Sequence, residues 1–169
     1  AEELKSQRRS GLYAAKIINI VGDPSGPRAV SLIAIHQHGI PNQFPQEVLQ
    51  ESENINFLEN LPREDLTKIP FVTIDPSDAR DHDDAVYAHA DEDPSNRGGH
   101  VLWVAIADVA HFVKPGSALD KEARKRGNST YFADRVVPML PDRLSGDLCS
   151  IHEGVERPCL AVCMTIDKS

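Results

Sequence analysis

Asp75-Pro-Ser-Asp78-Ala-Arg-Asp81-His-Asp83-Asp84 is the most informative stretch of the chain, because it gathers five aspartates in ten positions. Apolar segments with strand composition flank it, Phe-Val-Thr-Ile at 71–74 and Ala-Val-Tyr-Ala-His-Ala at 85–90. A loop whose two ends are held by strands leads the chain back towards its start. The sequence therefore predicts that Asp75 and Asp84 come close together, with Asp81 and Asp83 nearby.

Crowded carboxylates repel one another, and a protein reduces that cost either by spreading them into water or by binding a cation. Charge alone leaves both interpretations open, but the position of the aspartates directly at strand ends favours a metal site. Carboxylate oxygens suit Mg²⁺ or Mn²⁺ better than zinc, and the central glycine of a calcium-binding EF-hand loop is missing. His82 could be read as a zinc ligand, but among hard oxygen donors we expect it to point elsewhere. Metal sites of this kind are typical of enzymes that hydrolyse phosphodiesters.

Composition limits the function further. The chain has 169 residues and a formal net charge of −8, which argues against non-specific binding of nucleic acid. Basic residues are concentrated locally, in residues 1–16 and in Lys121-Glu-Ala-Arg-Lys-Arg126. The basic side chains of the second cluster could contact RNA phosphates or form a solvated helix face, and the solvated face is favoured. No apolar run is long enough to cross a bilayer. Three cysteines without framework spacing indicate reduced thiols and a cytoplasmic protein.

The residues after the acidic stretch predict a mixture of strands and a helix. The apolar run at 101–107 predicts a strand buried on both faces, with Trp103 in the core. Ser117 offers a helix N-cap, and that helix is expected to end at Arg126, before a glycine. Residues 160–166 predict a last strand.

The residues before the acidic stretch predict a hairpin and then a helix. Residues 12–21 and 29–35 have strand composition and are joined by a segment rich in turn formers. Pro45 is expected to open a helix from Gln46 to about Asn60. An isolated hairpin is unstable in water, so this one is expected to pair with further strands.

The aspartate stretch resembles the signature of the ribonuclease II/ribonuclease R family. Further segments of the chain follow in the order that this family has: Val104-Ala-Ile-Ala-Asp108-Val-Ala-His111, Gly116-Ser-Ala-Leu-Asp120, Ser129-Thr-Tyr131, Val137-Pro-Met-Leu-Pro141, Leu144-Ser-Gly-Asp147-Leu-Cys149-Ser150 and Arg157-Pro158. In addition, the N-terminal hairpin, His38-Gly-Ile-Pro41 and Phe44-Pro45 are similar to the end of a cold-shock domain in ribonuclease R-like members.

The resemblance implies an α+β fold in three parts. Residues 1–44 would be the C-terminal part of a cold-shock domain, which is a partial oligonucleotide-binding β-barrel. Residues 45–68 would be a helical linker. Residues 69–169 would be the N-terminal part of the RNB catalytic domain, with mixed sheet and helix.

The resemblance also implies a 3′→5′ hydrolytic exoribonuclease that degrades single-stranded RNA to nucleoside 5′-monophosphates with Mg²⁺, or alternatively Mn²⁺, as cofactor. Asp75 and Asp84 would be metal ligands, and Asp81 and Asp83 would complete the site or position a second metal and the attacking water. Tyr131 matches the family's aromatic that stacks on the 3′-terminal nucleotide, which suits a sequence-tolerant nuclease. From the residues alone, Tyr131 could equally be a half-buried strand residue.

Asp78 is not one of the family's four acidic positions. The family's later basic and aromatic residues are missing from this chain, so we expect the chain alone to be inactive or nearly so. Two other functions stay open: a non-catalytic RNA-binding or scaffold fragment, and an unrelated calcium-binding module. The complete acidic set favours the enzyme over the first, and the ordered downstream matches oppose the second. The sequence does not reveal the oligomeric state.

Overall fold

A computed structural model describes residues 2–3, 15–17, 20, 26, 29–55, 62–77 and 79–168. The chain forms two compact units. The first comprises residues 1–42 and 131–137, and the second comprises residues 43–130 and 138–169. Each unit is described by itself.

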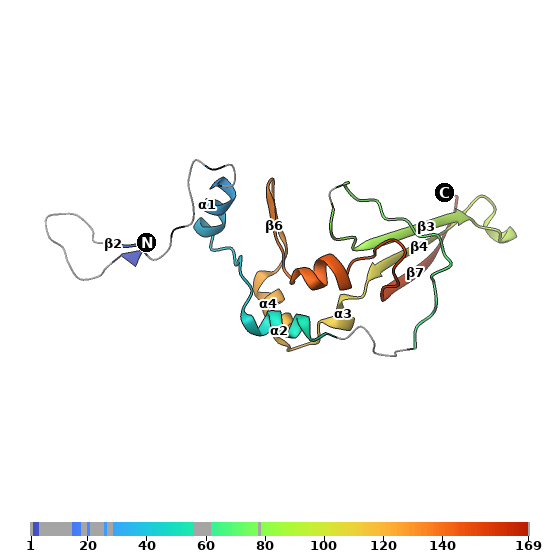
Figure 1. Cartoon of the computed structure of the whole chain (residues 1–169). Coiled ribbons are helices and arrows are strands. Elements are labelled where there is room, and N and C mark those ends of the chain that lie inside the picture. The colour runs from blue at the N-terminus through green and yellow to red at the C-terminus, as the bar shows by residue number, and fades with distance from the viewer. Residues whose placement is uncertain are drawn as a thin grey trace. The chain divides into compact units, whose positions relative to one another are not determined.

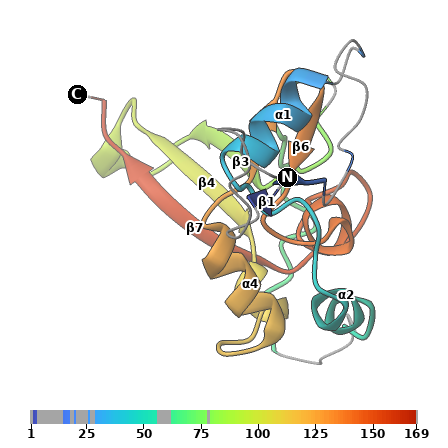
Figure 2. The same cartoon turned by 90° about the vertical axis from the view of Figure 1, so that its left-hand side faces the viewer.

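A three-stranded antiparallel sheet organises the second unit (Figure 1). It consists of β3 (Asp84–Ala90), β4 (His100–Ala107) and β7 (Cys159–Ile166), with β4 in the middle. A single turn of 3-10 helix, η1 (Pro94–Asn96), lies in the connection from β3 to β4. Figure 2 shows the same strand order from a second direction. The strands predicted at 85–90, 101–107 and 160–166 are therefore confirmed.

Three details of the sheet differ from expectation. The strand expected at 71–74 is reduced to an isolated bridge from Val72 to Val86. The expected burial of β4 on both faces is wrong for Ile106, which is 45% exposed, although Ala105 and Ala107 are buried. Trp103 is half-buried and lies outside the buried cluster, so its predicted place in the core is also corrected.

The helices of the second unit are short, and side chains cap the N-termini of α3 and α4. They are α2 (Gln46–Glu53), α3 (Val109–Phe112) and α4 (Ala118–Arg126). Ser117 caps α4 because its hydroxyl accepts the Asp120 amide hydrogen at 3.2 Å, and Gly127 follows its last turn, as predicted. Helix α2 begins after Pro45 as expected but ends at Glu53, short of the predicted end. Residues 56–60 lie outside the described residues.

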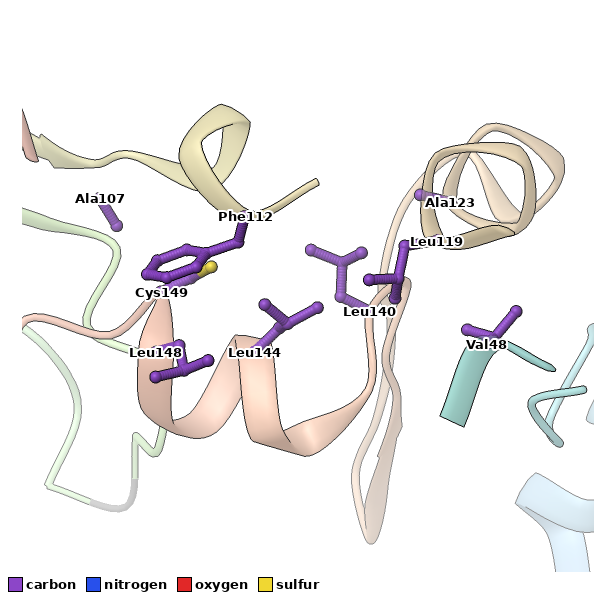
Figure 3. Close-up of a cluster of buried hydrophobic side chains, with 9 residues drawn as sticks. All are labelled: Val48, Ala107, Phe112, Leu119, Ala123, Leu140, Leu144, Leu148 and Cys149. Atoms are coloured by element: carbon purple, nitrogen blue, oxygen red, sulfur yellow. The ribbon is translucent and has the colours of Figure 1, made fainter. Parts of the chain in front are cut away.

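A buried apolar cluster joins these helices to the end of the sheet. Its residues come from α2, the end of β4, α3, α4 and a π-helical turn, η2 (Leu144–Leu148). Figure 3 shows Leu119 of α4 and Leu140 facing each other, with Leu144 and Leu148 below them. Leu119 and Leu144 are completely buried. Because Cys149 belongs to the cluster, the cluster lies directly beside the segment that follows η2.

Cys149 belongs to this cluster and should be chemically inert. Burial, followed by the charges of Asp83 and Asp108, raises the pKa of its thiol to about 12. Since the thiolate is the reactive form, we expect iodoacetamide at pH 8 to alkylate Cys149 roughly 100 times more slowly in the native full-length protein than in the unfolded one. Peptide mass spectrometry of timed samples measures both rates. Equal rates in the two states would contradict the buried placement.

The first unit corrects the predicted hairpin. Residues 29–35, expected as a strand, form helix α1 (Ala29–Gln37). Strand β2 (Ala15–Lys16) is extended as predicted, but it pairs with β1 (Glu2–Glu3). The remainder of the expected strand at 12–21 lies largely outside the described residues. A short continuous apolar run cannot be assigned to helix or strand from periodicity alone. In the structure, this run forms a helix.

Gly39 carries the signal for that helix. Its φ of 62° is in the left-handed region, and its amide donates to the His36 carbonyl at 3.4 Å. The Ile40 amide donates to the Ile35 carbonyl at 2.9 Å. These two bonds form the Schellman motif that ends many helices. A glycine soon after the apolar run therefore indicated a helix stop rather than the end of a strand.

Residues 131–137 of the first unit lie in a two-stranded sheet of β5 (Thr130–Phe132) and β6 (Arg135–Val137). Between these strands, the carboxylate of Asp134 accepts a hydrogen bond from the buried hydroxyl of Ser31 in α1. The contact ties α1 to the β5–β6 turn.

Among the helices that the structure describes, none is both long and apolar enough to cross a membrane.

Candidate functional site

The acidic loop starts and ends on the sheet, as the sequence predicted. Val72 and Val86 exchange two backbone hydrogen bonds of 2.9 Å each, so the residues before and after the aspartates run antiparallel. Asp84 is the first residue of β3 and lies opposite Ile106 of β4. The return of the chain is thereby confirmed.

The second half of the loop is held through its backbone. The Ala107 amide donates to the Asp83 carbonyl at 2.9 Å. The His82 amide donates to the Ser150 hydroxyl at 2.9 Å, and the Ile151 amide donates to the His82 carbonyl at 2.8 Å. Consecutive peptide groups between Asp81 and Asp84 are therefore bonded to the end of β4 and to the residues after η2.

Asp75, at the start of the loop, is held through its side chain. Nδ1 of His82 lies 2.8 Å from Oδ2 of Asp75. This hydrogen bond is the main reason that the pKa of Asp75 lies below its usual value, with a further contribution from Thr73. His82 therefore points at a carboxylate of the loop, so the expectation that it points elsewhere is wrong. Its ring also meets the ring of His152 edge-on, with 5.8 Å between the ring centroids.

Asp83 lies where the negative charges of the loop converge. Although its side chain reaches solvent, the surrounding protein removes enough water that burial is the first cause of a raised pKa. The charges of Asp81, Asp84 and Asp75 raise that pKa further. The other three aspartates singled out from the sequence thus act on Asp83 electrostatically, and this repulsion is what a cation would offset.

The donor set fits a hard divalent cation in kind, because its ligands would be carboxylate oxygens. Among the described residues, however, no three His, Cys, Asp or Glu side chains are arranged as a metal-binding group. The metal is therefore proposed below on the chemistry and mutual repulsion of the carboxylates. Asp78 lies outside the described residues.

Tyr131 belongs to the first unit, and the aspartates belong to the second. Its side chain is 64% exposed on β5. A role for Tyr131 in binding RNA stays a prediction.

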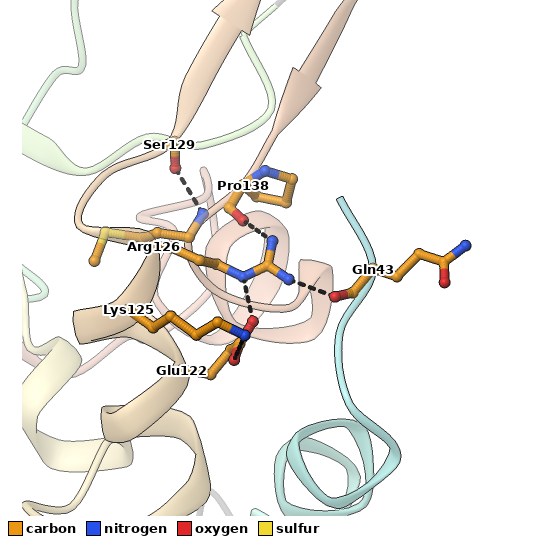
Figure 4. Close-up of polar contacts among 7 residues, drawn as sticks. Gln43, Glu122, Lys125, Arg126, Ser129 and Pro138 are labelled. Atoms are coloured by element: carbon orange, nitrogen blue, oxygen red, sulfur yellow. Dashed lines mark hydrogen bonds and ion pairs between the residues drawn. The ribbon is translucent and has the colours of Figure 1, made fainter. Parts of the chain in front are cut away.

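The basic residues of α4 are largely paired with acids. Arg124 bonds Asp120 at 3.0 Å, and Lys125 lies 3.7 Å from Glu122. The side chain of Arg126 is only 2% exposed and bonds Glu122 at 2.9 Å (Figure 4). Of the two interpretations of this cluster, Arg126 supports neither a phosphate contact nor a solvated face, because it is a structural residue.

The sequence did not predict the residues outside the loop that contact it and hold it in place. Ser150, Ile151 and His152 contact His82, and Arg157 bonds the side chain and the carbonyl of Asp147 nearby. The motif containing Ser150 was visible in the sequence, but its contact with a loop about 70 positions earlier was not.

A comparison with protein families assigns this fold and site to a known class of domain. The family model of the RNB domain matches residues 63–169. This chain therefore belongs to the RNB domain family, which confirms the resemblance seen in the sequence.

Particular relatives narrow the comparison. Ribonuclease R of Vibrio parahaemolyticus is 46% identical over 167 residues, which are 95% of this chain and 19% of that protein. Ribonuclease R of Escherichia coli is 45% identical over 157 residues, which are 89% of this chain and 19% of that protein. This chain thus spans about a fifth of the length of these curated relatives.

Solved structures of RNase R are also similar to this chain. RNase R of Mycoplasma genitalium in complex with double-stranded RNA matches with a TM-score of 0.78 and 33% identity, over 87% of this chain and 26% of that one. The same enzyme in complex with ribose-methylated single-stranded RNA matches with the same TM-score and identity, over 23% of that chain. The mixed α/β architecture is therefore similar to that of the matching part of RNase R.

Proposed function

We propose that this chain is part of a 3′→5′ exoribonuclease that hydrolyses single-stranded RNA to nucleoside 5′-monophosphates. The observation that carries the proposal is the position of the acidic loop at the edge of an RNB-family sheet, where the charges of Asp75, Asp81 and Asp84 all act on Asp83. The names of the relatives and the RNA in two solved complexes support the substrate class.

The proposed roles of the carboxylates come from the resemblance to the ribonuclease II/ribonuclease R family, whose four acidic positions match Asp75, Asp81, Asp83 and Asp84. Asp75 and Asp84, at the two ends of the loop, would hold Mg²⁺, or Mn²⁺ in its place. Asp81 and Asp83 would complete the site or hold the attacking water and a second ion. Bound there, the metal would activate water and neutralise phosphate charge. Tyr131 would stack on the 3′-terminal base, a contact that tolerates any base.

The proposal includes the domain organisation. Residues 1–44 would end a cold-shock domain with an oligonucleotide-binding barrel, residues 45–68 would link the domains, and residues 69–169 would begin the catalytic domain. The RNB match begins at residue 63, close to that last boundary. We further propose a cytoplasmic location, because RNA and reduced thiols suit that compartment.

A labelled substrate tests the reaction. The full-length protein is incubated with single-stranded RNA labelled at either end, with Mg²⁺ or with EDTA. A 3′ label should appear at once as a mononucleotide, and a 5′ label should remain on steadily shortening RNA. Both signals should need the metal. RNA that is bound but never cut would instead favour a non-catalytic scaffold.

The 169-residue chain alone should bind or cut RNA poorly. It spans only about a fifth of its relatives and carries a net charge of −8, which repels phosphates. We expect its rate of mononucleotide release to be on the order of a hundredfold or more below that of the full-length protein, since remote contacts position the substrate. Processive degradation by this chain at the full-length rate would contradict the expectation.

A further inference from the structure

Ser150 contacts the acidic loop from a fully buried position. Its side chain has no exposure, and its hydroxyl accepts the His82 amide hydrogen at 2.9 Å. The next residue, Ile151, donates its own amide to the His82 carbonyl at 2.8 Å. Both backbone groups of one loop residue are thus bonded to two consecutive residues that lie far away in sequence.

His82 extends this contact to the first aspartate. Its Nδ1 donates to Asp75, because an ionised carboxylate can only accept, at a separation of 2.8 Å. The His82 ring also contacts the ring of His152, which it meets nearly at right angles. His152 is held in turn, since its Nε2 lies 3.0 Å from the Gly146 carbonyl.

The segment behind the loop is itself rigidly supported. Leu144, Leu148 and Cys149 are buried in the apolar cluster, as Figure 3 shows. The guanidinium of Arg157 bonds both the carboxylate and the carbonyl of Asp147. A continuous set of contacts therefore leads from the core through Ser150 and His82 to Asp75.

We propose that residues 146–152 form a brace, with Ser150 as a positioning residue that acts through His82 to set the separation of Asp75 from Asp81, Asp83 and Asp84. Without the brace, mutual repulsion would spread the four carboxylates into water. Groups that orient metal ligands in this way commonly change metal affinity by about 10- to 100-fold when they are removed. The proposal rests on the metal site of the proposed function, but it concerns the residues behind that site.

Two variants of the full-length protein remove the brace at different points. Ser150→Ala removes the hydroxyl that accepts the His82 amide. His82→Phe keeps a ring against His152 but removes the bond to Asp75, and since the side chain of His82 is 26% exposed, this variant should fold even if Ser150→Ala does not. His82→Asn restores a donor near the position of Nδ1. Ser145→Ala is the matched control, because its hydroxyl faces the carbonyls of Leu140 and Pro141 and not the loop.

The decisive measurement is binding of Mn²⁺ alone, without RNA, followed by electron paramagnetic resonance or calorimetry. We expect the Kd for Mn²⁺ to rise by about 10- to 100-fold in Ser150→Ala and His82→Phe, to recover largely in His82→Asn, and to stay unchanged in Ser145→Ala. In RNA hydrolysis, the metal concentration for half-maximal rate should rise in the same order. If Ser150 and His82 had a purely structural role, their substitution would lower the rate of hydrolysis without changing the Kd for Mn²⁺ or the metal concentration for half-maximal rate.

The outcomes separate this inference from the proposed function. If the parent protein binds Mn²⁺ and its affinity is the same in His82→Phe, the brace is refuted whatever happens to RNA. If Mn²⁺ affinity falls as expected in a protein that cuts no RNA, the brace stands and the exoribonuclease is refuted. If the parent protein binds no Mn²⁺, both are refuted.

Discussion

Replacing Asp83 by asparagine in the full-length protein is expected to slow RNA hydrolysis on the order of a thousandfold, because the substitution keeps the shape of the side chain and removes its charge. Asp83 is the carboxylate on which the charges of Asp81, Asp84 and Asp75 converge. Removing its charge also removes repulsion, so RNA binding should be retained or slightly tightened. The measurement is mononucleotide release at saturating RNA and Mg²⁺, with RNA affinity followed by fluorescence anisotropy in EDTA.

Asp78→Asn is the matched control for this prediction. Asp78 lies in the same stretch of sequence but outside the four positions that match the family, so its substitution should change the rate less than about threefold, as is usual for a side chain without a catalytic role. An Asp83→Asn variant that hydrolyses RNA at the parent rate would remove Asp83 from the mechanism. Equal losses in both variants would point to the net charge of the loop rather than to specific ligands.

Replacing Arg126 by methionine is expected to destabilise the protein by about 3–5 kcal/mol, because it leaves a buried carboxylate with its closest partner gone. The Arg126 guanidinium bonds Glu122 at 2.9 Å, the Pro138 carbonyl at 3.1 Å and the Gln43 carbonyl at 2.7 Å. It also lies 3.7 Å from the centre of the Phe44 ring. These contacts hold the segment before α2 against the end of α4 (Figure 4). Calorimetry and hydrogen exchange of α4 in the full-length protein measure the loss.

Arg124→Met is the control for that variant, since it removes the same group from the same helix at a side chain that is 77% exposed. Exposed ion pairs contribute little, so its cost should stay below about 1 kcal/mol. The double variant Arg126→Met with Glu122→Met should recover part of the loss, because it removes the unpaired charge as well. Equal destabilisation by Arg124→Met and Arg126→Met would show that burial of the guanidinium does not matter.

Much of the candidate site could be predicted from the residues, because its decisive contacts are local. Asp75 and Asp84 lie at the two ends of one short loop. The apolar residues on each side of the loop predicted that both of its ends would be held by strand pairing. The bonds between Val72 and Val86 are what that pattern requires. The contact of Ser150 with His82 could not be predicted, because no local periodicity links two segments so distant in the chain.

The fold was predictable to a similar degree. Helix α4 followed from Ser117 and Gly127, whose capping roles depend only on neighbouring residues. Helix α1 was missed because the apolar run at 29–35 satisfies a strand and a helix equally well, and only Gly39 distinguished them.

Local chemistry in the sequence was sufficient for the carboxylate loop, the strand that follows it and the caps of α4, since each depends on residue type and short spacing, and the resemblance of several segments in order was sufficient for membership of the RNB family. Packing in three dimensions was needed to show which residues stand behind the loop, that Arg126 is buried rather than facing solvent, and that His82 turns towards Asp75. The physical reason is that burial and long-range hydrogen bonds depend on segments brought together by the core, and the core forms only when the whole unit folds.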